Sequence, residues 1–171
     1  MDIFKASERL MGMDEATWAR HANPISVYTR FTALPLLCAA VLSRFWLGWW
    51  ALVPIALVLV WTWLNPRLFS TPTHTDSWAA RGVMGERVFL NRHTVPIPTH
   101  HIRWGYGLSI AAGLGVIPLL WGLWIGDLAW VITGLALSMG AKTWFVDRMT
   151  FLYDEMARTH TEYAAWARRA R

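Results

Sequence analysis

Two long apolar stretches constrain what this chain can fold into. They run from Phe31 to Leu64 and from Trp104 to Val146, and each is too long for a single helical crossing of a hydrocarbon core about 30 Å thick. Each stretch must therefore turn back, and its glycines favour turns at Leu47-Gly48 and at Gly126-Asp127. The sequence predicts an all-α integral membrane protein, a four-helix bundle made of two tandem helical hairpins.

The composition agrees with a lipid bilayer as the solvent. Hydrophobic residues make up 55% of the chain and charged residues 16%, which is outside the usual range of water-soluble domains. The 13 tryptophans exceed what a core of this size buries, whereas a membrane interface offers each ring an apolar side and a wet side. The net charge of +5 comes from basic residues that flank the apolar stretches and form no dense stripe, so no nucleic-acid partner is expected.

The charged residues divide the chain into five segments. These are an N-terminal segment at 1–25, a first transmembrane hairpin at 26–64, a central loop at 65–103, a second hairpin at 104–146 and a tail at 147–171. Because the polar segments hold nearly all Lys and Arg, both termini and the central loop are expected on the cytoplasmic side of a bacterial inner membrane. The tail predicts an amphipathic helix that lies on the membrane or packs on the bundle. Asn65-Pro66 is expected to end the second helix.

The two hairpins carry similar motifs in the same order. The segment Arg20–Ile25 is echoed by Arg92–Ile97, and Thr62-Trp63-Leu64 is echoed by Thr143-Trp144-Phe145. These matches predict an internal duplication, with parallel copies related by a pseudo-twofold axis along the membrane normal, and with His21 and His93 facing each other across it. The alternative is that equivalent depths of any two hairpins attract Pro, Trp and Arg.

All six histidines fall in the segments assigned to the cytoplasmic side. This layout resembles that of membrane-bound di-iron desaturases and hydroxylases, which makes iron the alternative cofactor, with haem between paired histidines as a further option. The metal candidates are His21, Glu86, His93, His100 and His101. Oxygen ligands are also available from Asp147, Asp154 and Glu155. Because compact histidine-rich boxes are missing, the favoured interpretation of each histidine is an interfacial hydrogen-bonding residue, and no cofactor is predicted.

Polar residues at the ends of the predicted spans form a second candidate set. They are Asn23, Arg30, Asn65, Arg67, Glu86, Arg87, Lys142, Asp147 and Arg148. The structural interpretation is capping and pairing, with Glu86-Arg87 and Asp147-Arg148 as an ion-pair layer at the cytoplasmic end. The functional interpretation is a basic pocket for an anionic head group or phosphate, helped by Arg103. The structural interpretation is the favoured one.

The sequence favours a non-catalytic scaffold or accessory subunit that binds membrane lipids or a protein partner. Small-residue faces around Gly113 and Gly115 and around Gly134, Ser138 and Gly140 predict close helix contacts, within the bundle or in a homo-oligomer. The rival hypothesis is a membrane-embedded metal or haem oxidoreductase that uses the histidines. A transporter ranks last, because no ionisable residue lies deep within the spans.

Four short motifs carry a family resemblance. The run from His21 to Ser26 ending at Arg30, with Asn65-Pro66-Arg67, Gly85-Glu86-Arg87 and Asp147-Arg148-Met149, resembles a family of small bacterial and archaeal membrane proteins of unknown function. The resemblance covers roughly Glu15 to Tyr153. It implies the four-span architecture and brings no activity with it.

Overall fold

The computed structural model describes residues 14–167. All secondary-structure elements in this range are helices, and none is a strand. Three helical stretches are long and apolar enough to cross a membrane: Pro24–Leu68, Thr99–Ile125 and Leu128–Thr159. In the most apolar window of the first stretch only 6% of the residues are buried inside the protein. So much exposed apolar surface is stable only in contact with lipid.

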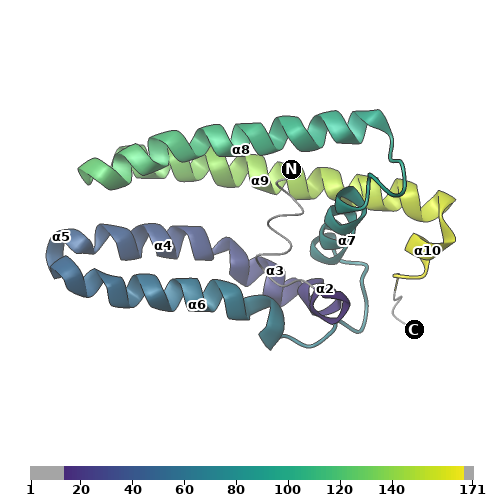
Figure 1. Ribbon diagram of the computed structural model, residues 1–171, viewed down its shortest axis with the longest axis horizontal. Coiled ribbons are helices and arrows are strands. Elements are labelled where there is room, and N and C mark those ends of the chain that lie inside the picture. The colour runs from purple at the N-terminus through teal and green to yellow at the C-terminus, as the bar shows by residue number, and fades with distance from the viewer. Residues whose placement is uncertain (1–13, 168–171) are drawn as a thin grey trace.

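The first stretch is not one rod, because it reverses direction at Gly48. The short helix α2 (Glu15–His21) precedes it, and it consists of α3 (Pro24–Phe31), α4 (Ala33–Leu42), α5 (Arg44–Leu47), the 3₁₀ helix η1 (Gly48–Ala51) and α6 (Leu52–Leu68). Gly48 adopts a φ of 55°, which an L side chain rarely tolerates. The reversal places α4 and α6 side by side as an antiparallel hairpin (Figure 1).

The second hairpin is formed by α8 (Thr99–Ile125) and α9 (Leu128–Thr159). Gly126 ends α8 in the left-handed conformation with a φ of 76°, and Asp127 caps α9 by accepting from the backbone N–H of Ala129 at 2.8 Å. The two helices approach closely because a Cβ on Gly115 would lie 2.6 Å from the backbone nitrogen of Ser138. Three predicted small-residue positions, Gly115, Gly134 and Ser138, therefore lie between α8 and α9, whereas Gly113 and Gly140 face open space.

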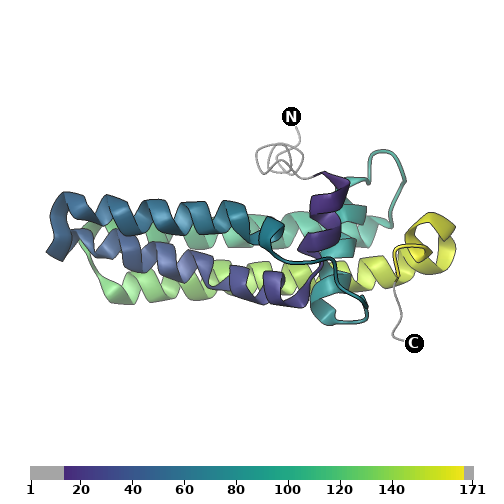
Figure 2. The same ribbon diagram turned by 90° about the horizontal axis from the view of Figure 1, so that it is seen from below.

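A helical head continues beyond the hairpins. At 1.5 Å per residue, the 32 residues of α9 span about 48 Å, well beyond a hydrocarbon core of about 30 Å. The C-terminal half of α9 packs against α7 (Trp78–Leu90), and the fully buried Val88, Phe89, Met149 and Leu152 form the centre of the largest core cluster. The short helix α10 (Thr161–Ala164) folds back on the end of α9 (Figures 1 and 2).

Exposed tryptophans mark two levels along the molecule. Trp49 at the first reversal is 88% exposed and Trp124 at the end of α8 is 74% exposed, while Trp63, Trp104 and Trp144 are exposed nearer the head. Trp104 and Trp124 are separated by about 30 Å along α8, which matches the thickness of a hydrocarbon core. The two levels therefore have the spacing expected of aromatic belts at the two interfaces of a membrane.

The two reversals lie at one end of the molecule, and α2, α7 and α10 lie at the other (Figure 1). Arg44 joins the hairpins at the reversal end, where its Nη2 donates to the carbonyl oxygens of Leu123 at 2.7 Å and Trp124 at 2.8 Å. These carbonyls belong to the last turn of α8, which has no further helical N–H groups to pair with them. Cys38 is buried against Leu119 of the other hairpin.

Three predicted boundaries differ from the structure. Pro66 does not end α6, which continues to Leu68, because a proline in the last turn removes only one hydrogen bond and the buried Asn65 anchors that turn to α3. The predicted boundary at Asp147 is not a break, because α9 continues to Thr159. The apolar stripe predicted for the tail packs on α7, which is one of its two expected placements. The third helix begins at Thr99, five residues before the apolar stretch.

Candidate functional site

A capped helix pair positions the first candidate residues. Asp14 caps α2 by accepting from the backbone N–H of Thr17 at 2.7 Å, and Asn23 caps α3 by accepting from that of Ile25 at 3.0 Å. Pro24 follows at the first helical position, where a missing N–H costs nothing. The sequence His-Ala-Asn-Pro therefore ends one helix and starts the next at an angle, which places the buried His21 beside α3.

The interface pocket is a cavity of about 200 Å³ between the hairpins on the head side. Its lining residues come from α2, α3, α7 and α9 and are His21, Val27, Arg30, Phe31, Val83, Glu86, Lys142 and Val146. Four of them are apolar and four carry ionisable groups. All four were named from the sequence: Arg30, Glu86 and Lys142 in the span-end set, and His21 among the metal candidates.

The ionisable groups of the interface pocket form two pairs. Lys142 Nζ donates to Glu86 Oε1 at 2.9 Å, and Arg30 Nη1 contacts His21 Nε2. Burial opposes ionisation of Glu86, but the charge and hydrogen bond of Lys142 and the charge of Arg30 outweigh it, so the Glu86 pKa is lowered. Burial, reinforced by the charges of Arg30 and Lys142, holds the pKa of His21 well below its ordinary value.

The charge balance of the interface pocket is positive. A neutral His21 accepts a hydrogen bond from Arg30, while its Nδ1 is buried without a hydrogen-bond partner among the described residues. Arg30 and Lys142 contribute two positive charges and Glu86 one negative charge, which leaves one net positive charge on the wall. This excess lies in a half-apolar cavity at the level of the aromatic belt.

A buried amide network holds α3 in place behind the interface pocket. Ser26 Oγ donates to Asn65 Oδ1 at 2.8 Å, and Asn65 Nδ2 donates to Thr29 Oγ1 at 2.8 Å. Asn65 has no exposed surface, so its hydrogen bonds within the protein replace those of water. Asn23 also ties α3 to the loop after α6, because its Nδ2 donates to the carbonyl oxygen of Ser70 at 2.9 Å.

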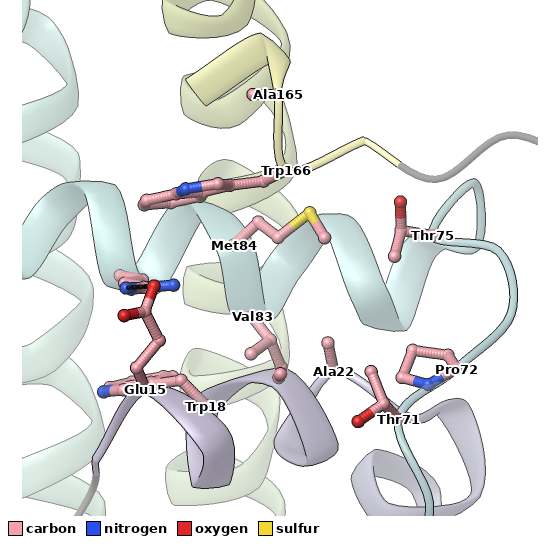
Figure 3. Close-up of a pocket in the computed structure, with 12 residues that line it drawn as sticks. Glu15, Trp18, Ala22, Thr71, Pro72, Thr75, Val83, Met84, Ala165 and Trp166 are labelled. Carbon is pink, nitrogen blue, oxygen red and sulfur yellow. Dashed lines mark hydrogen bonds and ion pairs between the residues drawn. The ribbon is translucent and has the colours of Figure 1, made fainter. Parts of the chain in front are cut away.

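A second cavity, the head pocket, has a volume of about 240 Å³ and lies between α2, α7 and the C-terminal segment. Figure 3 shows the rings of Trp18 and Trp166 on opposite sides of it, with Glu15 between them. Arg87 fills part of this gap, because its guanidinium lies 4.3 Å from the Trp166 ring centroid and 3.3 Å from a Glu15 oxygen. The head pocket thus already holds an internal cation, and it was not predicted because its walls come from segments far apart in sequence.

A histidine–carboxylate cluster lies where α8 begins beside the end of α9. Among the described residues, His100, His101 and Glu155 are the group whose metal-ligating atoms all lie within 4.8 Å of one another. His101 Nε2 lies 2.9 Å from Glu155 Oε2, and His100 Nε2 lies 3.7 Å from the same oxygen. Two predicted metal candidates are therefore brought together, whereas His21 and Glu86 line the interface pocket and His93 is exposed in the loop after α7.

The remaining predicted residues have local partners. The guanidinium of Arg67 lies 4.1 Å from the Trp63 ring centroid, and that of Arg148 lies 4.9 Å from the Phe151 centroid. Asp147 Oδ1 accepts from Trp78 Nε1 at 3.0 Å. The span-end set therefore contributes to several contacts around the head, and Arg30, Glu86 and Lys142 are the members that share a cavity.

Comparison with known proteins leaves activity open and settles the family. No curated protein is significantly similar to the chain, and no solved structure matches it. One family, described only as of unknown function, matches residues 4–171, which is nearly the whole chain. Through this match the chain belongs to the family of unknown function DUF6653.

Proposed function

We propose that this protein is a four-span membrane protein that binds the phosphate of an anionic lipid in the interface pocket, as a non-catalytic scaffold or accessory subunit. The observation that carries the proposal is the excess positive charge of Arg30 and Lys142 over Glu86 in a cavity between the hairpins. A phosphate is the ligand class that such cations bind best at a membrane interface.

The depth of the interface pocket supports a lipid ligand. Lys142 precedes the belt residue Trp144 by two positions on α9, so its ammonium lies at the level where lipid head groups begin. Val27, Phe31 and Val146 supply an apolar wall on which glycerol and the first acyl carbons can pack. A soluble anion gains nothing from this wall, whereas a phospholipid uses both halves.

Lipid retention tests the proposal. The purified protein is exchanged into nanodiscs that contain phosphatidylglycerol and phosphatidylcholine, and its bound lipids are measured by native mass spectrometry. We expect it to retain phosphatidylglycerol selectively. Arg30→Gln and Lys142→Gln should each weaken this retention roughly tenfold, because a charge-assisted hydrogen bond contributes about 1.4 kcal/mol or more. Arg103→Gln is the matched control, since Arg103 is exposed on the same end of the molecule and does not line the pocket.

Two outcomes would contradict lipid binding at this pocket. One is equal retention of the two lipids by the natural protein. The other is an equal loss for Arg103→Gln and Lys142→Gln, which would indicate general surface attraction. Inorganic phosphate is added in a parallel titration: phosphate binding that is lost in Lys142→Gln, by a protein that retains both lipids equally, would identify a free anion as the ligand in place of the lipid.

The same proposal places the head in the cytoplasm of a cell with an inner membrane, with each hairpin crossing the bilayer twice. Single cysteines at Trp49, Thr73 and Glu162 in a Cys38→Ala background test it with an impermeant maleimide. Trp49→Cys is expected to react in intact cells, and the other two only after permeabilisation. Opposite sides for Thr73→Cys and Glu162→Cys would refute the paired crossings.

A further inference from the structure

We propose that His100, His101 and Glu155 bind a divalent first-row transition metal ion such as Zn²⁺ or Fe²⁺. This site shares no residue with the interface pocket, so it stands or falls separately from lipid binding. The three side chains come from two helices whose ends meet in the head, and an ion between them would connect the start of α8 to the end of α9.

The donor atoms converge on one point. The Nε2 atoms of both histidines approach the same oxygen, Glu155 Oε2, at 2.9 and 3.7 Å. Neighbouring residues in a helix usually diverge by about 100°, yet the two rings lie with their centroids 4.1 Å apart and their planes tilted by 39°. The first turn of α8 therefore directs two adjacent imidazoles to one side, which is the arrangement that chelation requires.

The charge environment of Glu155 also favours a cation. Among the described residues Glu155 forms no ion pair with Lys or Arg, whereas the neighbouring Asp154 pairs with Arg81 at 2.9 Å. Arg158, three residues later on the same helix, forms no ion pair with Glu155, and Arg148, seven residues earlier, directs its guanidinium to aromatic rings. The ion-pair partners of Glu155 among the described residues are thus both imidazoles, and a metal ion between them would neutralise the carboxylate.

Burial divides the cluster into a fixed base and an open side. The side chain of His101 is 1% exposed, and those of His100 and Glu155 are 55% and 48% exposed. His101 Nε2 donates to Glu155 in this structure, and a metal at Nε2 would require the ring proton to move to Nδ1, which forms no hydrogen bond within the described residues. Two imidazoles and one carboxylate with an open side form the donor set of hydrolytic zinc sites and of non-haem iron sites.

Cobalt titration tests the site directly. The full chain, purified in detergent with a tag that contains no histidine and stripped with a chelator, is titrated with CoCl₂ and followed by visible absorption. One equivalent should bind with the absorption bands of nitrogen and oxygen ligation. Glu155→Gln and His100→Ala should weaken binding at least about tenfold, and His74→Ala, which removes an exposed histidine outside the cluster, should leave it unchanged.

Both test substitutions are at half-exposed side chains, so the variants should fold, and thermal unfolding checks this. Zn²⁺ should raise the unfolding temperature of the natural protein and of His74→Ala, but not that of Glu155→Gln, because only the folded cluster binds the metal. The proposal is overturned if the natural protein binds no stoichiometric Co²⁺. It is equally overturned if Glu155→Gln or His100→Ala binds as the natural protein does.

Discussion

Replacing Gly85 by alanine tests how closely the head helix α7 packs on α9. A Cβ at Gly85 would overlap the carbonyl oxygen of Met149 and lie 2.5 Å from its carbonyl carbon and 3.0 Å from its Cα. All three atoms belong to backbone, so no rotamer change relieves the overlap. The helices must separate, and the fully buried Val88, Phe89 and Met149 then lose contacts.

The expected cost follows from two opposing contributions. Overpacking a core lowers the free energy of unfolding by about 1–3 kcal/mol. We expect about 3 kcal/mol here, because the atoms that the new Cβ meets belong to the backbone and cannot move aside by a rotamer change. Alanine regains about 1 kcal/mol over glycine inside a helix. The net loss is about 2 kcal/mol, which lowers the unfolding temperature of a chain of this length by about 4–8 °C.

Intrinsic tryptophan fluorescence during heating in detergent measures this effect. Gly107→Ala is the matched control, because Gly107 is also inside a helix and its added Cβ would meet no atom within 4 Å. The control should unfold at the same temperature as the natural protein or slightly higher. An unchanged or raised unfolding temperature for Gly85→Ala would show that α7 does not contact the Met149 backbone.

Three further substitutions have defined outcomes. Arg44→Ala should lower stability by about 1–3 kcal/mol, because it leaves the last carbonyls of α8 unpaired, and hydrogen exchange should rise at the end of α8. Asn65→Ala should cost a similar amount in thermal unfolding, since Ser26 loses its buried acceptor. The pKa of His21 is depressed in the fold, so stability should fall as pH drops below 6.5; His21→Gln should flatten the unfolding temperature between pH 7.5 and 5.

The all-helical fold and the two reversals were predictable because hydropathy and glycine act locally. An apolar stretch that is too long for one crossing must turn, and Gly48 and Gly126 both adopt the positive φ that a tight reversal uses. The end of α6 was not predictable, because the rule that proline ends a helix depends only on local sequence. The anchoring of Asn65 to Ser26 is a contact between residues far apart in the chain.

The candidate sites were predictable in their residues but not in their partners. His100 and His101 stand out as an adjacent pair, but their contact with Glu155 depends on the register between α8 and α9. Close contacts at Gly115 and Ser138 set that register. The internal duplication stays a prediction. Each half of the chain has a short helix followed by a hairpin, but any two tandem hairpin units would show the same order of elements, so this order does not test the duplication.

Both proposed sites are attached to a single continuous helix, and this limits how they can act together. Lys142 and Glu155 are separated by about 20 Å along α9 at 1.5 Å per residue, and nothing interrupts the helix between them. A head group in the interface pocket therefore cannot reach the histidine–carboxylate cluster. An ion in the cluster influences the pocket only by shifting α9 as a whole against α7, and the backbone contact at Gly85 opposes such a shift. Lipid retention should therefore be the same with and without Zn²⁺.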